Sequence, residues 1–324
     1  MIDEIAQESA LAELIERYFR TSFTTENALI TDAVRRMLAA GGKRLRPRIT
    51  LLSVEACGGD AAEFLHLAAY MELIHVATLI HDDVVDNAVT RRGINATAVD
   101  YGNRTSVLAG DYLFAWIFKN VTAGYPAPIP HVLSATLAEI CDGEVLQLHA
   151  LGDVSTSRET YVEIARKKTA SLFAAAAECG AVAAGGDRSS IMALRTFGES
   201  YGIAFQMLDD VLDLTGDTAT LGKPVGNDLV ERKMTIPLIL ALSRGDEGFR
   251  ARVETFFAGT RSSTRPTARS AAPLIEQIEQ QGGLAATRSL IAANVERAKS
   301  ALGPVAAGPA KERLASLAEA LLQP

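Results

Sequence analysis

Apolar residues recur at helical spacing along almost the whole chain of 324 residues, and this periodicity restricts the fold more than any other feature. Runs that alternate apolar with polar residues, which would indicate half-buried strands, are scarce. Ala and Leu stand where strands would carry β-branched clusters. Hydrophobic residues make up 48% of the chain, which is enough for a substantial core and excludes a disordered protein. The sequence therefore predicts an all-α fold.

Glycine pairs break the periodic pattern at Gly41-Gly42, Gly58-Gly59 and Gly185-Gly186, and such residues typically mark turns. No sequence repeat of fixed period is present, and the length is compatible with a single domain over residues 1–324. We expect helices over residues 3–20, 26–40, 46–57, 60–87, 104–122, 131–149, 156–179, 188–216, 231–244, 247–257, 273–281, 283–302 and 308–322.

The charge balance is acidic, because 32 Lys and Arg stand against 39 Asp and Glu and give a net charge of −7. Nucleic-acid binding rests on a basic surface, so no nucleic-acid partner is expected. Cys57, Cys141 and Cys179 lie far apart and are odd in number, which indicates neither a disulfide framework nor a zinc site. A reducing, cytoplasmic location is the expectation that follows.

The N-terminal segment MIDEIAQESALAELIERYF is acidic and amphipathic, unlike a secretory signal or an Arg-rich transit peptide. A membrane span needs about 18 apolar residues in a row, and we find no such run. The Ala-rich stretch from Ala170 to Ala184 comes closest, but Glu178 interrupts it. Peripheral contact with a membrane stays open.

One short pattern occurs twice, as HDDVVD at residues 81–86 and LDDVLD at residues 208–213. Each places Asp at positions i, i+1 and i+4 of an apolar helix. Residues i and i+4 lie about 40° apart around a helix, so Asp82 and Asp86 share a face, and so do Asp209 and Asp213. Two carboxylates about 6 Å apart repel each other by roughly 3 kcal/mol at an effective dielectric constant near 20.

Cations would remove this repulsion. Carboxylate oxygens without nearby His or Cys favour a hard cation, most plausibly Mg²⁺. Mg²⁺ keeps water ligands and shares phosphate oxygens, so a diphosphate held between two such helices is the natural substrate. The alternative is that each cluster is a solvated face or end of a helix. The repetition within apolar helices favours the metal site.

An acidic protein that binds diphosphates needs localised positive charge, and basic residues gather in four places. A turn opened by glycines, with a helix N-terminus behind it, carries the first group, and such a turn can present backbone N–H groups to an anion. Each group alone is usually solvated surface charge. The four groups are Lys43, Arg44 and Arg46; Arg91 and Arg92; Arg166, Lys167 and Lys168; and Lys223 and Lys233.

His75 lies seven residues before Asp82, which is two helical turns and nearly the same face. A single His on an apolar helix is more often a core residue with a satisfied hydrogen bond. Its alignment with the acidic cluster favours contact with a ligand here.

These motifs together resemble the trans-isoprenyl diphosphate synthase (polyprenyl synthetase) family, and most of all its long-chain octaprenyl and polyprenyl members. The resemblance runs from about residue 28 to 243. The motifs agree with the family in order, spacing and type. They are GGKRLRP at 41–47, ELIHVATLIHDDVVDNAVTRRG at 72–93, KKTASLF at 167–173, FQMLDDVLDLTGD at 205–217 and LGKPVGNDLVERKMTIPL at 221–238.

The resemblance implies an antiparallel helical bundle around a central cavity, with a metal site at its mouth, and a homodimer. It implies that Asp82, Asp86 and Asp209 bind Mg²⁺ for the allylic diphosphate. The resemblance also implies that Asp83, Asp210 and Asp213 support these metal ligands.

The resemblance also assigns the substrate contacts. Arg91, Lys168 and Lys233 would hold the allylic diphosphate, with Lys223 nearby. Lys43, Arg46, His75 and Arg92 would hold isopentenyl diphosphate, and Thr169 and Gln206 would present oxygen dipoles to the reacting centre. One position departs from the family pattern, because Arg232 stands where Gly usually precedes Lys233.

The activity implied is head-to-tail condensation of isopentenyl diphosphate with an allylic diphosphate, farnesyl or geranylgeranyl diphosphate. Negative charge on the departing diphosphate would be stabilised by metal and cations, and the helices would keep water from the allylic cation. Contact with a membrane would serve product release.

Product length in such enzymes depends on residues before the first Asp cluster, where Ala77 and Thr78 are both small. Each helical turn left open adds about 5.4 Å of depth, which favours a product of about C40, as for quinone side chains. Met71, Ile74, Phe114 and Phe118 are candidates for the floor of this tunnel or are ordinary core residues. A geranylgeranyl or other medium-chain synthase is the alternative.

Three other classes compete. A terpene cyclase also carries DDxxD, but its second metal motif normally mixes Asn or Asp with Ser or Thr and Glu. A phosphohydrolase of the HD type needs further His ligands, and His66, His75, His131 and His149 lack a suitable context. A non-catalytic subunit of a two-component synthase usually loses the Asp clusters, so this chain would be the catalytic subunit of any such pair.

Overall fold

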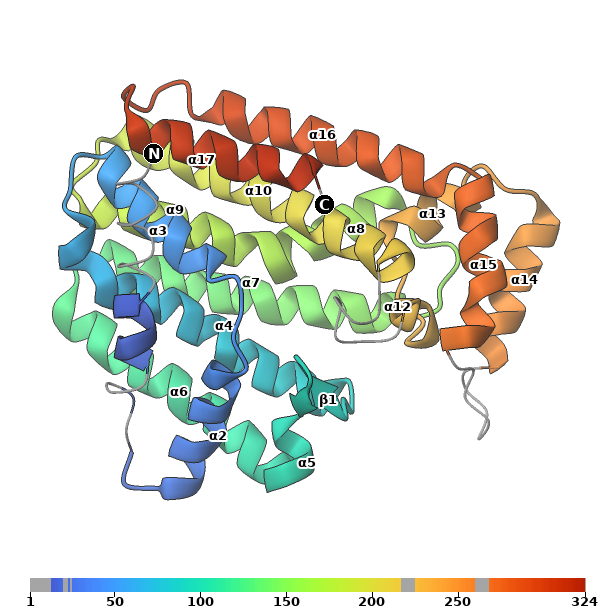
Figure 1. Cartoon of the computed structure of the whole chain (residues 1–324), viewed down its shortest axis with the longest axis horizontal. Coiled ribbons are helices and arrows are strands. Elements are labelled where there is room, and N and C mark those ends of the chain that lie inside the picture. Colours follow the sequence, from blue (N-terminus) through green and yellow to red (C-terminus); the bar gives the residue numbers. More distant parts are fainter. Residues whose placement is uncertain (1–12, 20–22, 24, 217–224, 260–267, 324) are drawn as a thin grey trace. The chain divides into compact units, whose positions relative to one another are not determined.

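The computed structural model describes residues 13–19, 23, 25–216, 225–259 and 268–323. It confirms the all-α class, since helices form nearly all of the regular structure in these residues (Figure 1). Residues 13–19 are helical as well. The elements are α2 (Ala28–Ala39), α3 (Leu45–Ala56), η1 (Ala61–Phe64), α4 (Leu65–Val85), β1 (Thr90–Arg91), β2 (Ile94–Asn95), α5 (Thr97–Tyr101), α6 (Asn103–Gly124), α7 (Pro128–Ala150), α8 (Arg158–Ala165), the π-helical turn η2 (Arg166–Ala170), α9 (Ser171–Ala183), α10 (Arg188–Thr215), α12 (Asn227–Val230), α13 (Ile236–Leu242), α14 (Glu247–Gly259), α15 (Ala268–Gln280), α16 (Gly283–Ala301), α17 (Pro309–Glu319) and η3 (Ala320–Leu322).

The chain divides into two compact units, each assembled from separate segments. The first unit holds Met1–Ser134, Ala175–Arg195 and Pro304–Arg313, and the second holds Ala135–Ala174, Thr196–Gly303 and Leu314–Pro324. The single domain over residues 1–324 stays a prediction.

Helix α4 forms the centre of the first unit and packs against α3 and α6. Its residues Leu67, Met71, Leu73 and Ile74 are almost completely buried. Within the described residues, one stretch, Ala61–Val85, is long and apolar enough to cross a membrane, with a mean hydropathy of 1.3. Because 67% of that window is buried, it is the core helix of the unit. The expectation that residues 170–184 come closest to a membrane span is therefore wrong.

The second unit is built around α13, which packs against α15 and α16 and also contacts α8. Pro237 stands in the first turn of α13, where its missing N–H costs nothing, and Thr235 is the N-cap. Helix α10 begins at Arg188, and the carboxylate of the preceding Asp187 accepts the Ser190 amide at 2.7 Å.

The hairpin β1–β2 was not expected from the sequence. Thr90 pairs with Asn95 and Arg91 with Ile94, so the loop consists of Arg92 and Gly93 alone. Both loop residues have positive φ, 51° and 77°. A two-residue hairpin loop with a type I′ turn requires this conformation, which Asn-Gly usually signals and Arg-Gly does not.

Three helix boundaries also differ from the expectation. A π-helical turn interrupts the helix expected over 156–179, and α9 continues to Ala183. The helix expected over 231–244 begins only at Ile236, because Arg232 adopts a left-handed φ of 62° that ends helical geometry. Helix α15 begins at Ala268 instead of residue 273 and includes Pro273.

Candidate active site

The first Asp cluster lies at the C-terminal end of α4, which ends at Val85 with Asp86 as its C-cap. Asp82 and Asp86 are partly exposed, whereas Asp83 is completely buried. The C-terminal end of a helix carries partial negative charge, so acidic side chains there are unfavourable without a cation. Two partly exposed carboxylates therefore lie at a place where positive charge would stabilise them.

Asp83 pairs with the hairpin that follows α4. Its Oδ1 accepts the Arg91 Nε at 2.7 Å and the Arg91 Nη2 at 2.6 Å. Burial raises the pKa of Asp83, and the Arg91 guanidinium opposes this rise. Asp83 thus anchors Arg91 to α4 and is a supporting residue by its geometry.

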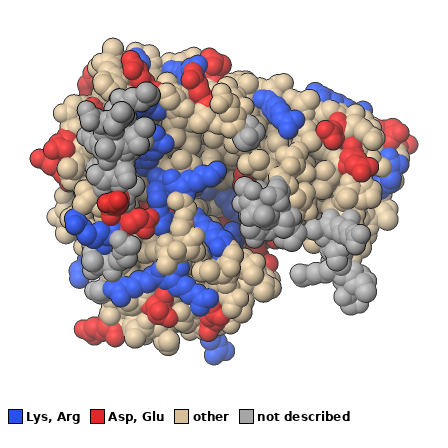
Figure 2. All heavy atoms as spheres, in the orientation of Figure 1, with Lys and Arg blue, Asp and Glu red and all other residues tan. Residues whose placement is uncertain are grey.

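The basic turn before α3 meets the tip of the same hairpin. The Arg92 guanidinium donates to the Gly41 carbonyl and lies against Gly42, where an added Cβ would be 3.0 Å from Arg92 Nη1. Lys43 is exposed, and Arg46 is buried in the first turn of α3. Lys and Arg side chains gather on the face where Figure 1 draws α2 and the end of α4 (Figure 2).

Arg44 holds this turn in place. With a left-handed φ of 48°, it donates to Glu16 at 2.6 Å, to the buried Glu72 at 2.9 Å and to the Leu38 carbonyl at 2.9 Å. Arg44 is therefore structural, and Lys43 and Arg46 on either side of it are presented by the fixed turn.

His75 lies deep among protein atoms although part of its surface stays open. Burial lowers the pKa of His75 well below its ordinary value, and the charges of Arg46 and Arg92 lower it further. The imidazole is therefore neutral at pH 7. The three predicted contacts His75, Arg46 and Arg92 thus belong to one electrostatic cluster in the first unit.

The second Asp cluster occupies the last two turns of α10. Asp209 is exposed, while Asp210 and Asp213 are buried. The Asp213 carboxylate accepts the Asp228 amide at 3.1 Å, and its carbonyl accepts the Gly226 amide at 2.7 Å. Asp213 thus fixes the start of α12.

Asp210 ends a chain of hydrogen bonds. The Thr169 hydroxyl donates to Gln206 Oε1 at 2.7 Å, and Gln206 Nε2 donates to Asp210 Oδ1 at 3.0 Å. The other carboxylate oxygen accepts the Ile236 amide at 3.2 Å. Burial and then the Asp228 charge raise the pKa of Asp210 to about 7. The Tyr161 hydroxyl lies beside this carboxylate and lowers that pKa, without reaching the geometry of a hydrogen bond.

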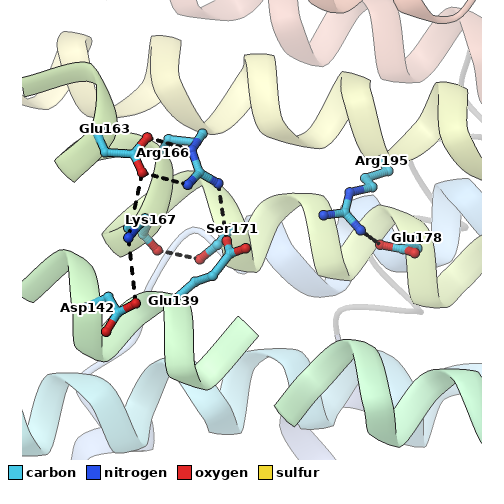
Figure 3. Close-up of polar contacts among 8 residues, drawn as sticks. All are labelled: Glu139, Asp142, Glu163, Arg166, Lys167, Ser171, Glu178 and Arg195. Carbon is cyan, nitrogen blue, oxygen red and sulfur yellow. Dashed lines mark hydrogen bonds and ion pairs between the residues drawn. The ribbon is translucent and has the colours of Figure 1, made fainter. Parts of the chain in front are cut away.

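The π-helical turn η2 separates its three cations. Figure 3 shows Arg166 and Lys167 pointing toward acidic side chains of α7 and α8. Arg166 pairs with Glu163 at 2.9 Å, and Lys167 lies 3.6 Å from Asp142. Both interactions are partly exposed and belong to the surface.

Lys168 has a different environment, because its ammonium pairs with Glu144 of α7 and both side chains are largely buried. Gly143 lets α7 approach this turn closely, since a Cβ there would be 2.6 Å from the Lys168 amide nitrogen. Of the three cations, Lys168 is thus the one whose ion pair with α7 is largely buried on both sides.

Lys233 pairs with Glu231 of the same turn at 2.6 Å, and its amide donates to the Asp228 carbonyl at 2.8 Å. Lys223 lies outside the described residues.

Comparison with known proteins decides what these clusters belong to. Residues 27–273 match the family described as Polyprenyl synthetase. The chain belongs to this family. It is 36% identical over 287 residues to octaprenyl diphosphate synthase of Escherichia coli K12, covering 89% of this chain and 87% of the relative. It is 35% identical over 327 residues to the short chain isoprenyl diphosphate synthase of Methanothermobacter thermautotrophicus, covering 100% and 98%.

Among solved structures, the polyprenyl synthase of Caulobacter crescentus CB15, complexed with calcium and isoprenyl diphosphate, matches with a TM-score of 0.90. The two chains are 38% identical, and the match covers 99% of this chain and 96% of the other. This polyprenyl synthetase is therefore a prenyltransferase that elongates prenyl chains, and members of its family depend on a metal.

The donors of this polyprenyl synthetase fit a hard cation. Within the described residues, no three His, Cys, Asp or Glu side chains lie together so as to hold a metal by themselves. Asp82 and Asp86 of the first unit are partly exposed, and Asp209 of the second unit is exposed. Carboxylates of this kind can bind a hard cation and leave coordination positions for water and substrate oxygens.

Sequence reasoning missed three residues of this site, namely Glu144, Tyr161 and Asp228. Each acts on a predicted site residue, Glu144 on Lys168 and the other two on Asp210. Glu144 follows Gly143 in α7, and this was its only local signal. Asp228 stands in the motif at 221–238, but nothing local links it or Tyr161 to Asp210.

Proposed function

We propose that this polyprenyl synthetase joins isopentenyl diphosphate head to tail to an allylic primer, farnesyl or geranylgeranyl diphosphate, and makes a long all-trans product. One observation supports the assignment most. Each Asp cluster has carboxylates that reach the surface, Asp82, Asp86 and Asp209, next to carboxylates that are buried. The exposed or partly exposed members are those to which the family resemblance gives a role as metal ligands.

Asp82, Asp86 and Asp209 would hold Mg²⁺, which would neutralise the charge that builds on the departing diphosphate. Arg91, Lys168 and Lys233 bind that diphosphate, with Lys223 nearby. The ion pairs of these lysines with Glu144 and Glu231 fit this role, because a diphosphate can replace each carboxylate as the partner of the lysine.

Lys43, Arg46, His75 and Arg92 bind the diphosphate of isopentenyl diphosphate. The neutral His75 is suited to donate one hydrogen bond without adding to the repulsion among the arginines around it. The cationic pocket thereby holds the double bond within reach of the allylic carbon. We expect the released diphosphate to take the proton, because the sequence offers no obvious dedicated base.

A long product, of about C40, is supported by Ala77 and Thr78, one turn before Asp82. Ala77 is buried in α4 and its small side chain restricts little space. Thr78 folds back on its own helix, because its hydroxyl donates to the His75 carbonyl at 2.8 Å. Such a product would serve as a quinone side chain.

A shorter product is the second candidate, and the similarity to the short chain isoprenyl diphosphate synthase of Methanothermobacter over the full chain favours it. The two candidate functions differ in the length of the product, so measuring that length decides between them.

We further propose that the protein is a homodimer and is located in the cytoplasm. Three large apolar residues of α6 are exposed, Val107 by 39%, Leu108 by 60% and Tyr112 by 39%, and a second copy would cover them. The alternative is that the chain is the catalytic half of a heteromeric synthase. Peripheral contact with a membrane would help an apolar product to leave.

The test incubates the purified full-length protein with labelled isopentenyl diphosphate and geranyl, farnesyl or geranylgeranyl diphosphate in turn, with Mg²⁺ or with a chelator. We expect Mg²⁺-dependent elongation from farnesyl or geranylgeranyl diphosphate to a long product. A chain that is inert with every primer contradicts the homomeric enzyme, and rescue by a second subunit would support a heteromer. A product that stops at geranylgeranyl diphosphate supports the second candidate.

A further inference from the structure

The loop between α12 and α13 carries a backbone conformation that side chains rarely adopt. Arg232 has a φ of 62°, in the left-handed region that usually belongs to Gly or Asn. It directly precedes Lys233, for which a role at the allylic diphosphate is proposed above. A large side chain at such a position needs a compensating interaction.

That interaction is a reciprocal contact with the turn that follows α7. The Gly152 amide donates to the Arg232 carbonyl at 2.8 Å, and the Arg232 Nη2 donates to the Leu151 carbonyl at 3.0 Å. Backbone and side chain of one residue thus bind two successive residues of the other segment.

Gly152 makes room for the guanidinium. A Cβ at position 152 would lie 2.3 Å from Arg232 Nη2 and 2.7 Å from Arg232 Nε. The guanidinium therefore lies directly on the Gly152 backbone, and it would have to leave if position 152 carried a side chain.

The other end of the same loop is fixed by α10. Asp213 accepts the amides of Gly226 and Asp228, and the Asp228 carbonyl in turn accepts the Lys233 amide. Residues 226–233 are therefore attached at Asp213 on one side and at the Leu151-Gly152 turn on the other.

We propose that Arg232 is a positioning residue for the prenyl transfer. It fastens the loop to the turn after α7 and so sets the place from which Lys233 reaches the allylic diphosphate. The inference rests on the proposed role of Lys233. It assigns to Arg232 no contact with substrate and predicts an effect on the allylic substrate alone.

The test compares variants that remove the contact from either side. Arg232→Gly keeps the left-handed backbone and removes the guanidinium. Gly152→Asn tolerates the left-handed φ of 71° at that position and displaces the guanidinium without changing Arg232. Arg250→Ala is the matched control, because Arg250 donates to the Val154 carbonyl at 3.0 Å in the same connecting segment but comes from α14.

We expect Arg232→Gly and Gly152→Asn each to raise the KM for the allylic substrate by roughly 5- to 20-fold, the size expected for loss of one or two hydrogen bonds. The KM for isopentenyl diphosphate should stay within about twofold of the wild-type value, because its contacts lie on other segments. The double variant should resemble the single variants, since both remove the same contact. Arg250→Ala should leave both KM values unchanged.

If Arg232 had a merely structural role, the variants would have a lower melting temperature, but the ratio of their KM values for the two substrates would be unchanged. Unchanged allylic KM values in both variants, or equal increases for both substrates, would overturn the proposal. Arg232→Lys, which keeps one donor and the positive charge, should restore part of the wild-type KM, and it replaces Arg232→Gly if that variant fails to fold.

A measurement without substrate separates this inference from the proposed function. Hydrogen exchange at the Gly152 amide should be faster in Arg232→Gly than in the wild type and in Arg250→Ala. If the exchange rate in Arg232→Gly equals that of the wild type, the Arg232 side chain does not hold the Leu151-Gly152 turn, and the proposal is wrong. A wild-type protein that condenses no substrate overturns the proposed function, whatever the exchange result.

Discussion

The Thr169 hydroxyl donates its proton to the side-chain carbonyl of Gln206 at 2.7 Å, and this sets the orientation of the Gln206 amide. The amide nitrogen is thereby directed to Asp210 at 3.0 Å. Because the Thr169 proton is engaged, the lone pairs of its oxygen stay available to positive charge. The bond joins the π-helical turn η2 to α10 within one unit.

The first prediction concerns this bond. Thr169→Val keeps the shape of the side chain but removes the donor, so the Gln206 amide loses its fixed orientation. We expect kcat to fall by roughly 10- to 30-fold, the size of one to two hydrogen bonds, with the melting temperature nearly unchanged. Thr169→Ser retains the hydroxyl and should keep kcat within a few fold. Wild-type turnover of Thr169→Val would show that the bond has no part in the reaction.

The sequence predicted this network only in part. Thr169, Gln206 and Asp210 stood in motifs that the chain shares with its family. The π-helical turn that brings Thr169 to Gln206 has no local signal, and the space that α7 leaves beside it at Gly143 is a tertiary contact. Helices with strong periodicity were predicted within a few residues of their true ends.

Segments that depend on tertiary contacts were not predicted. The hairpin at Thr90–Asn95 is held by the bond from Arg91 to Asp83, which lies in the preceding helix. The late start of α13 follows from the contact between Arg232 and Gly152, which are 80 residues apart in sequence. Local propensity cannot reveal interactions of this kind.

The second prediction separates two neighbouring carboxylates. Asp82→Asn removes a partly exposed carboxylate of α4, and we expect turnover to fall about 10²- to 10³-fold while the melting temperature stays the same or rises. Asp83→Asn weakens a buried partner of Arg91, so it should lower the stability by about 1–3 kcal/mol. Thermal unfolding and steady-state kinetics on both variants test this division. Full activity of Asp82→Asn at saturating Mg²⁺ would remove Asp82 from the metal ligands.

The third prediction concerns Ala77, which is fully buried in α4 and stands one turn before Asp82. Ala77→Phe adds a ring on the proposed path of the growing chain and should shorten the product. Overpacking should also cost about 1–3 kcal/mol of stability. Chromatography of the dephosphorylated products measures the length, and Ala77→Ser, with little added volume, serves as the control. An unchanged distribution of products in a folded Ala77→Phe protein would place Ala77 outside the tunnel wall.

The fourth prediction follows from His75, whose pKa is lowered well below its ordinary value by burial and by Arg46 and Arg92. Between that lowered pKa and about 6.5, the unfolded chain binds a proton that the folded protein does not. The free energy of unfolding must therefore fall as the pH drops below about 6.5, by up to about 1.4 kcal/mol per pH unit for this one group. Above that pH the contribution is fully present.

His75→Gln cannot take up a proton, so its stability should fall less between pH 7 and pH 5, whereas the exposed His149→Gln should behave like the wild type. Urea unfolding across this range measures the slopes, and equal slopes for wild type and His75→Gln would mean that the folded protein protonates His75 as readily as the unfolded chain does.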